Sequence, residues 1–458
     1  MKKLFEETSS LDFKCYNEFG LSEDLLMEHA AACMANFIRQ NFSTKNTIFI
    51  VCGGGNNGAD GIVLARMLHG EFAIKVFLLD DPKTKIGQLQ LERAKRIGVG
   101  FVCNFETADI FVDAIFGSGL SKPLDGKYLE VLNMLNYADG FKIACDIPSG
   151  LGFCEFPLKA DVTICMGALK TILFEDFAKD FVGEIIVANL GIANDFYESE
   201  SSSFLLEKHD LHLPFRTKLS SHKGNFGHLA VICGEKKGAA ILSAKAGLSF
   251  GAGLVSVVSE EEIVLEPDLM QGKIIPANCT AIALGMGLGE ISSQSLHNIL
   301  NLKIRKIIDA DLMINSEILN FLATDVVITP HPKEFVALLK ICNIAQINVE
   351  ELQKNRFHYA KIFSRSFSNV TLLLKGANML IAKDGKIFVN PLGSPALSKG
   401  GSGDVLSGMI GALLAQGFSS LDAAKNASLG FSLASMNYDK NNYSMTPSDL
   451  INLIKDIR

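Results

Sequence analysis

Acidic residues stand beside glycine-rich turns in this sequence, a pattern typical of sites that bind phosphate and move protons. The stretch ALSKGGSGDVLSG, residues 396–408, leads through Asp404 into a run with helical spacing. Backbone amides at a helix start bind anions, and in phosphoryl transfer an aspartate accepts the proton of the attacking hydroxyl. An acid in a first helical turn also favours the helix dipole, whatever the function. The turn before Asp404 has more small residues than capping requires, which favours a ligand: Gly400, Gly401, Ser402 and Gly403.

A second group of polar residues follows strand-like segments in the N-terminal half. FIVCGGGNNGADGIVLARML reads as a strand, a glycine-rich turn and a helix whose apolar pattern begins after Gly61. Asp113 lies inside the apolar run FVDAIFGSGL, and Asp146 and Ser149 end the run IACDIPSG. Ligands of open parallel sheets collect at the carboxyl ends of strands, so we expect these three segments to converge on one crevice.

A cation is one partner that a buried Asp113 could have in this crevice. Asn57, Asp113 and Ser149 offer only oxygen ligands, which suits a hard ion and argues against zinc. Two other interpretations stay open. Backbone amides could satisfy Asp113, and Asp146 could merely begin the turn at Pro148.

Two further residues of the C-terminal half are candidates for binding. Lys375, in LLLKGAN after a strand, could meet phosphates or be a solvated strand end. His331, between prolines in VVITPHPKEF, could contact substrate or be a packed, hydrogen-bonded histidine.

The elements that must position these residues alternate along the whole chain. Short β-branched runs alternate with amphipathic stretches, which predicts parallel sheets covered by helices, and their continuous apolar character predicts strands buried on both faces. We expect a hairpin at MLIAKDGKIFVN, and strands at 46–52, 73–79, 109–115, 141–145, 161–165, 184–189, 228–233, 254–258, 280–285, 304–308, 325–329 and 370–375. The acidic, serine-rich segment 195–204 is the best candidate linker, so we expect two α/β domains at residues 1–204 and 205–458.

Composition limits the classes of function. The chain has 458 residues, which favours more than one domain, and a formal charge of -7 argues against a protein that grips nucleic acid or an anionic membrane. The ten cysteines form no CxxC pair, and Cys52, Cys145, Cys165 and Cys233 lie in apolar runs. We therefore expect reduced core thiols and, without a signal peptide or a long apolar segment, a cytoplasmic protein.

The N-terminal motifs resemble those of a known family. GGGNNGADG, VDAIFGSGL and DIPSG, in that order after LLMEHAAACMA, are similar to the NAD(P)HX epimerases, a Rossmann-like family that interconverts the C6 epimers of hydrated NADH or NADPH. The resemblance implies a potassium ion on Asn57, Asp113 and Ser149, and Asp146 as the acid/base that contacts substrate. It implies that two segments hold the dinucleotide: Asn56, Asn57, Gly58, Ala59 and Asp60, and Gly117, Ser118, Gly119, Leu120, Ser121, Lys122 and Pro123. The family usually has glycine where this chain has Ala59.

The C-terminal motifs resemble a second family. SHKGNFGHLAVICGEKKG, ALGMGLGE, VVITPHPKEF, LLLKGANMLIA and the Asp404 stretch are similar to the ADP- or ATP-dependent NAD(P)HX dehydratases of the ribokinase-like superfamily. The resemblance implies Asp404 as the base, with Gly287 and His331 also at the substrate, and magnesium between nucleotide phosphates. It implies nucleotide contacts at Gly400–Gly403 and at Lys375, Gly376, Ala377, Asn378 and Met379. Lys333 stands where the family typically has glycine.

Together the resemblances imply one enzyme with two activities. It would epimerise NADHX and NADPHX and dehydrate the S epimer with ADP or ATP, and we expect an assembly of identical chains. Two alternatives stay open. One is a ribokinase-like kinase of a small alcohol with a regulatory N-terminal domain, and the other is a non-enzymatic N-terminal domain like those of messenger RNA decapping scaffolds.

Overall fold

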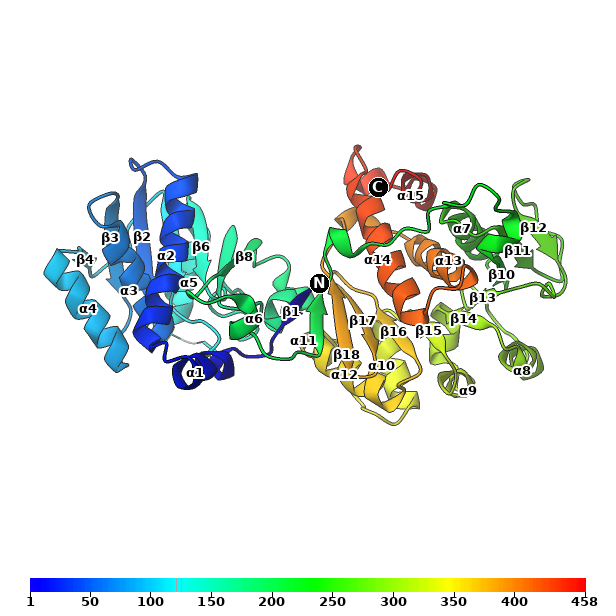
Figure 1. Ribbon diagram of the computed structural model, residues 1–458, viewed down its shortest axis with the longest axis horizontal. Helices are drawn as coiled ribbons and strands as arrows, with labels where there is room; N and C mark the ends of the chain where they lie inside the picture. The colour runs from blue at the N-terminus through cyan, green and yellow to red at the C-terminus, as the bar shows by residue number, and fades with distance from the viewer. Residues whose placement is uncertain (121, 125) are drawn as a thin grey trace. The chain divides into compact units, whose positions relative to one another are not determined.

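The chain folds into two compact α/β units, as a computed structural model shows (Figure 1). The structure describes residues 1–120, 122–124 and 126–458. One unit comprises Lys3–Ser201, and the other comprises Ser202–Arg458 together with Met1 and Lys2. The first is called the N-terminal unit and the second the C-terminal unit.

The N-terminal unit is built on a parallel sheet. Within the described residues this sheet has seven strands in the order β4-β3-β2-β5-β6-β7-β8. Neighbouring strands in this order are parallel. The bounds are β2 Thr47–Cys52, β3 Ala73–Leu78, β4 Phe101–Val102, β5 Ile110–Ala114, β6 Phe141–Cys145, β7 Val162–Met166 and β8 Glu184–Ala188. The order reverses between β2 and β5, as it does in doubly wound dinucleotide-binding folds.

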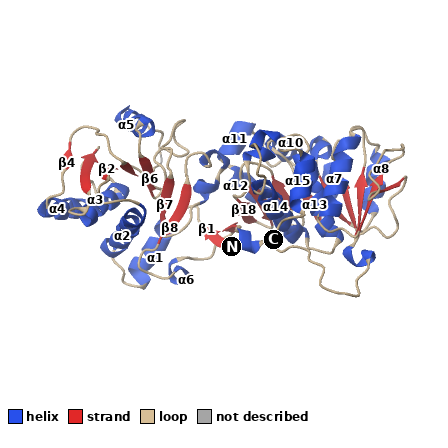
Figure 2. Ribbon diagram, turned by 90° about the horizontal axis from the view of Figure 1, so that it is seen from above, coloured by secondary structure: helices blue, strands red, loops and turns tan. Residues whose placement is uncertain are grey.

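Helices cover both faces of this sheet (Figure 2). In β2, Ile48, Ile50 and Cys52 belong to the cluster that includes residues of α2 and α3, whereas Phe49 and Val51 pack with residues of α5 on the other face. A strand buried on both sides must be apolar throughout, and this explains the continuous run TIFIVC. The helices are α1 Ser9–Glu18, α2 Glu23–Asn41, α3 Asn56–Leu68, α4 Lys85–Ile97, α5 Gly126–Tyr137 and α6 Asn194–Tyr197.

Helix α3 begins earlier than the sequence pattern indicates. The apolar pattern begins after Gly61, but the first residue of the helix is Asn56 and only residues 53–55 form the turn. The reason is packing, because Gly58 lies against the turn. A Cβ at Gly58 would come within 1.8 Å of the Gly53 carbonyl oxygen. This glycine permits close approach of helix and turn rather than an unusual loop conformation.

The C-terminal unit contains a larger, mixed sheet. Its order within the described residues is β1-β9-β18-β17-β16-β15-β14-β13-β10-β11-β12. Strands β10 to β16 pair in parallel, and β16, β17 and β18 are antiparallel neighbours. The bounds are β1 Lys2–Leu4, β9 Ser203–Leu205, β10 His228–Ile232, β11 Leu254–Val258, β12 Met270–Gly272, β13 Ala281–Leu284, β14 Arg305–Ile308, β15 Val326–Ile328, β16 Thr371–Leu374, β17 Met379–Lys383 and β18 Lys386–Asn390.

A large apolar cluster holds the helices of this unit to one face of the sheet. It joins residues of α7, α13, α14 and α15 to residues such as Val231, Ile307 and Leu373. Helix α12 packs on β16, β17 and β18. The helices are α7 Lys237–Ser249, α8 Ser293–Asn301, α9 Ile318–Leu322, α10 Pro332–Ile341, α11 Val349–Lys354, α12 Arg356–Ser366, α13 Ser402–Ala415, α14 Ser420–Met436 and α15 Pro447–Ile454.

The predicted two-unit α/β architecture is confirmed, and each predicted strand has a counterpart in the structure. Four short strands had no signal in the sequence: β1, β4, β9 and β12. The candidate linker 195–204 is more structured than its polar composition indicates. Tyr197 is buried, and Ser203 begins β9, which pairs with β18.

The structure also bears on the cysteines and on membranes. All ten cysteines are free thiols. Cys52, Cys145 and Cys165 are buried as expected, whereas Cys233 is only partly buried. In the described part of the chain, no helix combines the length and the apolar character that a bilayer crossing requires.

Candidate functional sites

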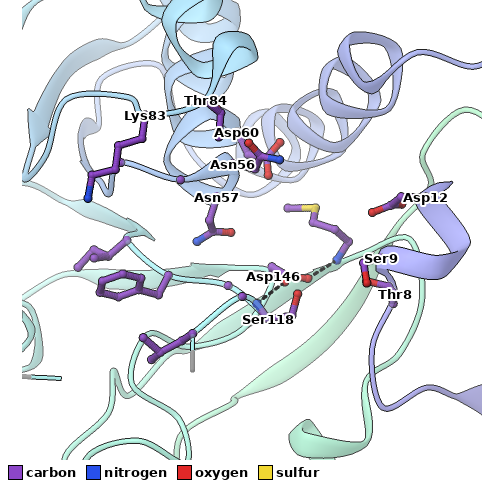
Figure 3. A pocket seen from close by; sticks show the side chains of 18 of the residues that line it. Thr8, Ser9, Asp12, Asn56, Asn57, Asp60, Lys83, Thr84, Ser118 and Asp146 are labelled. Atoms are coloured by element: carbon purple, nitrogen blue, oxygen red, sulfur yellow. Dashed lines mark hydrogen bonds between the residues drawn. The ribbon is translucent and has the colours of Figure 1, made fainter. Parts of the chain in front are cut away.

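A cavity of about 520 Å³ opens in the N-terminal unit where the strand order reverses. Residues after β2 and β5 line it, together with Asp146 after β6 (Figure 3). Of the predicted residues, these line the cavity: Asn56, Asn57, Asp60, Gly117, Ser118, Gly119, Leu120 and Asp146. Gly58 and Ala59 are buried in the first turn of α3, and Lys122 and Pro123 lie outside the lining. Ser121 is not among the described residues.

Asp146 is held in a strained backbone conformation at the cavity floor. Its φ is 72°, which only glycine adopts without cost, and its amide donates to the carbonyl of Ile164 at 2.8 Å. The carboxylate accepts from the Ser118 amide at 3.1 Å and from Lys170 Nζ at 2.6 Å. Burial alone would raise the pKa of Asp146, but the charge and hydrogen bond of Lys170 lower it overall. Asp146 is therefore a fixed, ionised carboxylate.

Asp113 and Ser149 lie together beneath the cavity. Ser149 Oγ donates to Asp113 Oδ1 at 2.6 Å, and the Ser149 amide donates to Oδ2 at 2.8 Å. The Ile115 amide also donates to Asp113, so backbone amides do satisfy part of this buried carboxyl. Burial raises the pKa of Asp113 to about 6, against these hydrogen bonds. The amide nitrogen of Asn57 is buried without a hydrogen-bond partner among the described atoms.

The cavity contains an acidic residue, Asp12, that the sequence did not predict, beside the predicted Asp60. Asp12, on α1, accepts a hydrogen bond from Tyr197 at 2.7 Å, and both residues line the cavity with Asp60. Burial raises the pKa of Asp60 well above its usual range, and the charge of Asp146 raises it further. Burial also raises the pKa of Asp12. One cavity thus holds an ionised carboxylate beside carboxyl groups that favour the neutral form.

In the C-terminal unit, Asp404 occupies the first turn of α13. This helix begins at Ser402 after Gly401, whose φ is 93°, and the side chain of Asp404 is half-buried. Burial and the charge of Asp309 raise the pKa of Asp404 to about 6. A helix N-terminus by itself favours the ionised form, so the neighbouring groups outweigh the dipole here. A carboxyl that titrates near neutrality is suited to accept a proton.

Asp309 is the residue that the sequence reading missed at this site. It follows β14, is 2% exposed, and accepts from Lys375 Nζ at 2.6 Å and from Ser407 Oγ at 2.7 Å. A Cβ at Gly403 would lie 3.3 Å from Lys375 Nζ and 3.8 Å from Asp309 Oδ2. Lys375, Asp309 and the start of α13 are therefore neighbours. The signal in the sequence was an aspartate directly after the strand RKII.

The segment after β16 is anchored by a buried arginine. Arg356, the first residue of α12, donates to the carbonyl oxygens of Asn378 at 2.9 Å and Lys375 at 3.1 Å. Gly376 and Ala377 are exposed, whereas Asn378 and Met379 are buried. The predicted nucleotide-binding segment is thus a short exposed turn with fixed ends.

His331 is the N-cap of α10. Its Nδ1 accepts from the amides of Lys333 and Glu334, and Glu334 accepts from the His331 amide, which completes a capping box. Contact with substrate through the exposed ring stays a prediction. Gly287, after β13, has φ 55° and accepts from the Lys236 amide at 3.0 Å.

Comparison with known proteins links each unit to a described family. The family model described as YjeF-related protein N-terminus matches residues 23–172, and the model described as NAD(P)H-hydrate dehydratase matches residues 229–456. The bifunctional NAD(P)H-hydrate repair enzyme of Helicobacter pylori is 44% identical over 100% of both chains. This chain belongs to the family of bifunctional NAD(P)H-hydrate repair enzymes.

Two further proteins are similar to this chain at lower sequence identity. The repair enzyme of Coxiella burnetii is 32% identical, with 89% of each chain covered. A crystal structure of the ADP/ATP-dependent NAD(P)H-hydrate dehydratase from Bacillus subtilis, co-crystallised with ATP and Mg²⁺, is 26% identical and has a TM-score of 0.46. It covers 53% of this chain and 92% of that chain.

Two residues of this repair-enzyme chain depart from the motifs noted above, and both are accommodated. Ala59 lies inside α3, where alanine is a better helix former than glycine, so the departure favours the observed helix start. Lys333 is the second residue of α10, and its side chain is exposed. Its backbone amide serves His331, as any residue at this position except proline could.

Proposed function

We propose that this chain repairs hydrated NADH and NADPH in two steps. The N-terminal unit interconverts the R and S epimers at C6, and the C-terminal unit dehydrates the S epimer with ADP or ATP. The observation that carries the proposal is that one chain of the repair-enzyme family contains two aspartates whose pKa values are shifted in opposite directions. Asp146 is paired and ionised in a cavity at a topological switch point, and Asp404 titrates near pH 6 at a glycine-rich helix start.

In the proposed epimerase site, residues at the cavity mouth hold the substrate. Asn56, Asp60 and the loop that begins at Gly117 contact the dinucleotide, and Asp146 exchanges a proton with the reacting ring. Inverting C6 requires an intermediate in which C6 is no longer a stereocentre. A proton must leave the substrate to form this intermediate and return to the substrate afterwards. The support is the position of these groups on one cavity of about 520 Å³.

The residues beneath this cavity fit a potassium ion. Asn57, Asp113 and Ser149 would bind it through an amide, a carboxylate and a hydroxyl oxygen, the donors that a hard cation prefers. The support is a buried Asp113 that accepts a hydrogen bond from Ser149, and an Asn57 Oδ1 that lies against the same loop, 3.0 Å from a Cβ placed at Gly117. The ion would supply positive charge that favours the ionised form of Asp113 and orders the cavity floor.

In the proposed dehydratase site, Asp404 accepts the proton of the C6 hydroxyl as its oxygen attacks the terminal phosphorus of the nucleotide. The bond between this phosphorus and the oxygen that joins it to the next phosphate breaks, which releases AMP from ADP, or ADP from ATP. The ring nitrogen's lone pair then expels phosphate from C6, and loss of a C5 proton restores the dihydronicotinamide. Backbone amides of residues 400–403 would stabilise the phosphoryl charge, and Lys375 would leave Asp309 to meet the phosphates.

Asp309 would hold magnesium together with the nucleotide in this proposal, beside Asp404, whose pKa the charge of Asp309 raises. The ion would neutralise phosphate charge in the transition state. Assembly of identical chains also stays a prediction, which light scattering at several protein concentrations would test.

The test is to supply the full chain with both NADHX epimers, K⁺, Mg²⁺ and either nucleotide, and to follow dihydronicotinamide absorbance, free phosphate and each epimer. We expect complete recovery of NADH with one phosphate released per NADH. No nucleotide-dependent recovery would contradict the proposal. Accumulation of a stable phosphorylated product would instead identify a kinase.

A further inference from the structure

Lys170 is a buried lysine behind the floor of the N-terminal cavity. Its side chain is 1% exposed and does not line the cavity, yet its Nζ lies 2.6 Å from Asp146 Oδ1. The same nitrogen donates to the Met166 carbonyl at 3.1 Å and contacts Cys165 Sγ at 3.5 Å. A lysine is rarely buried unless its charge is paired, so this position carries a specific requirement.

The backbone on both sides of Lys170 is fixed by the start of the chain. The Phe5 amide donates to the Leu169 carbonyl at 2.9 Å, and the Thr171 amide donates to the Phe5 carbonyl at 2.9 Å. This bridge sets the direction in which the Lys170 side chain leaves the backbone. Burial and the contacts of Nζ with Asp146, Met166 and Cys165 then hold the ammonium group in place.

The two oxygens of Asp146 have different surroundings. Oδ1 accepts from Lys170 Nζ and from the Met166 amide at 3.1 Å. Oδ2 accepts from the Ser118 amide at 3.1 Å, and a Cβ placed at Gly117 would lie 2.8 Å from it. Gly117 lines the cavity, so Oδ2 faces that loop and the cavity. Oδ1 faces the lysine.

The other titratable groups near Asp146 are acids, and their ionisation opposes that of Asp146. Asp60 on α3 and Asp12 on α1 line the same cavity, and Asp113 on β5 and the thiols of Cys145 and Cys165 lie on neighbouring strands. The charge of Asp146 raises the pKa of both Asp60 and Asp12, which shows that these carboxyl groups sense one another. Burial would lower the pKa of Lys170, but Asp146 and Cys165 raise it overall, so the lysine stays charged.

We propose that Lys170 is a positioning residue of the epimerase, which holds Oδ1 of Asp146 so that Oδ2 is the atom that exchanges a proton with substrate. The lysine does not touch substrate and acts through Asp146. The inference rests on the proposed epimerase function and extends it, since no motif of the sequence pointed to Lys170. An Asp146 without this cation would be a buried carboxyl among acids, and it would take up a proton.

The test uses the full chain with Lys170→Met, Lys170→Arg and Lys170→Ala. Epimerisation of the pure R epimer is followed without nucleotide as a function of pH. For Lys170→Met we expect kcat to fall at least about 100-fold while KM changes less than about threefold, since general acid–base catalysis contributes factors of this size. We expect the acid limb of the pH profile to move to higher pH. Lys170→Arg, which keeps the charge, should retain more activity than Lys170→Met.

Chemical rescue separates positioning from loss of folding. Ethylammonium can enter the space left in Lys170→Ala, and we expect it to restore activity at least about tenfold, but to leave Asp146→Asn unchanged. Dehydration of the pure S epimer by the same chains reports whether the rest of the protein is intact.

Three results have distinct meanings. A wild-type chain that does not epimerise would contradict the proposed function itself. Normal wild-type epimerisation with an unchanged kcat and acid limb in Lys170→Met would overturn the role of Lys170 alone. If Lys170→Met loses both activities, Lys170→Ala decides: rescue by ethylammonium supports positioning, and failure of rescue overturns it.

Discussion

Asp404 and Asp146 are prepared for proton transfer in opposite ways. Asp146 is ionised by contact with Lys170, and Asp404 is brought toward neutrality by burial and by Asp309. The sequence predicted both aspartates because Asp146 ends a strand-like run and Asp404 follows a glycine-rich turn at a helix start. It did not predict Lys170 or Asp309. Each is a single charged residue, in MGALK and in RKIIDAD, and no local pattern indicates which residues it contacts.

The titration of Asp404 predicts the pH dependence of dehydration. The base must be ionised, and the pKa of Asp404 is about 6 in the free protein. We expect kcat/KM for the S epimer to be level above about pH 7, half-maximal near pH 6 and to fall about tenfold per pH unit well below it. Initial rates over a range of roughly pH 4.5 to 8 would check this profile. The Asp404→Asn variant should lose at least about 100-fold in kcat/KM at every pH. A rate that rises as the pH falls below 6 would contradict the role of a base.

The proposed potassium site predicts a linkage between K⁺ and stability. A ligand that binds only the folded state stabilises it in proportion to the logarithm of its concentration. We expect the unfolding temperature of the N-terminal unit to rise with K⁺ at constant ionic strength, and Li⁺ to have little effect. Asp113→Asn should remove the response. An equal response to K⁺ and Li⁺ in the wild type would indicate an ionic-strength effect instead.

At the scale of elements, the longer strands were predictable from the sequence and the shortest strands were not. A strand buried on both faces must be apolar throughout, so β2, β5 and β10 were visible as runs. Strands β4 and β12 are two and three residues long and draw their pairing from a neighbour, so their own residues carry little signal. The start of α3 at Asn56 precedes its apolar pattern, because glycine and asparagine ordinarily indicate turns, whereas here Gly58 is required by packing.

That packing predicts different effects for Gly58 in α3 and Gly55 in the preceding turn. Gly58→Ala places a Cβ 1.8 Å from the Gly53 carbonyl oxygen, whereas a Cβ at Gly55 meets nothing within 4 Å. We expect Gly58→Ala to lower the free energy of unfolding of the N-terminal unit by about 1–3 kcal/mol or more, and Gly55→Ala to change it little. Denaturant unfolding would measure both. Equal stability of the two variants would show that Gly58 is not needed for close approach.

At the scale of the whole molecule, each unit has its own apolar core and its own candidate site. The two proposed activities meet through the substrate, because hydration produces both epimers and the dehydratase accepts only S. Substitution at one site should therefore leave the other activity intact. We expect Asp146→Asn to dehydrate pure S epimer, and Asp404→Asn to interconvert epimers, each within about twofold of the wild type.

The most direct test of the account follows both epimers and NADH in one reaction that contains Mg²⁺, K⁺ and nucleotide. The wild type should convert the whole mixture to NADH. Asp146→Asn should consume the S epimer and then slow to the spontaneous rate of epimerisation, and Asp404→Asn should form no NADH. An equal mixture of the two variants should again convert both epimers. If Asp146→Asn clears the R epimer as fast as the wild type, the assignment of the two steps to the two aspartates is contradicted.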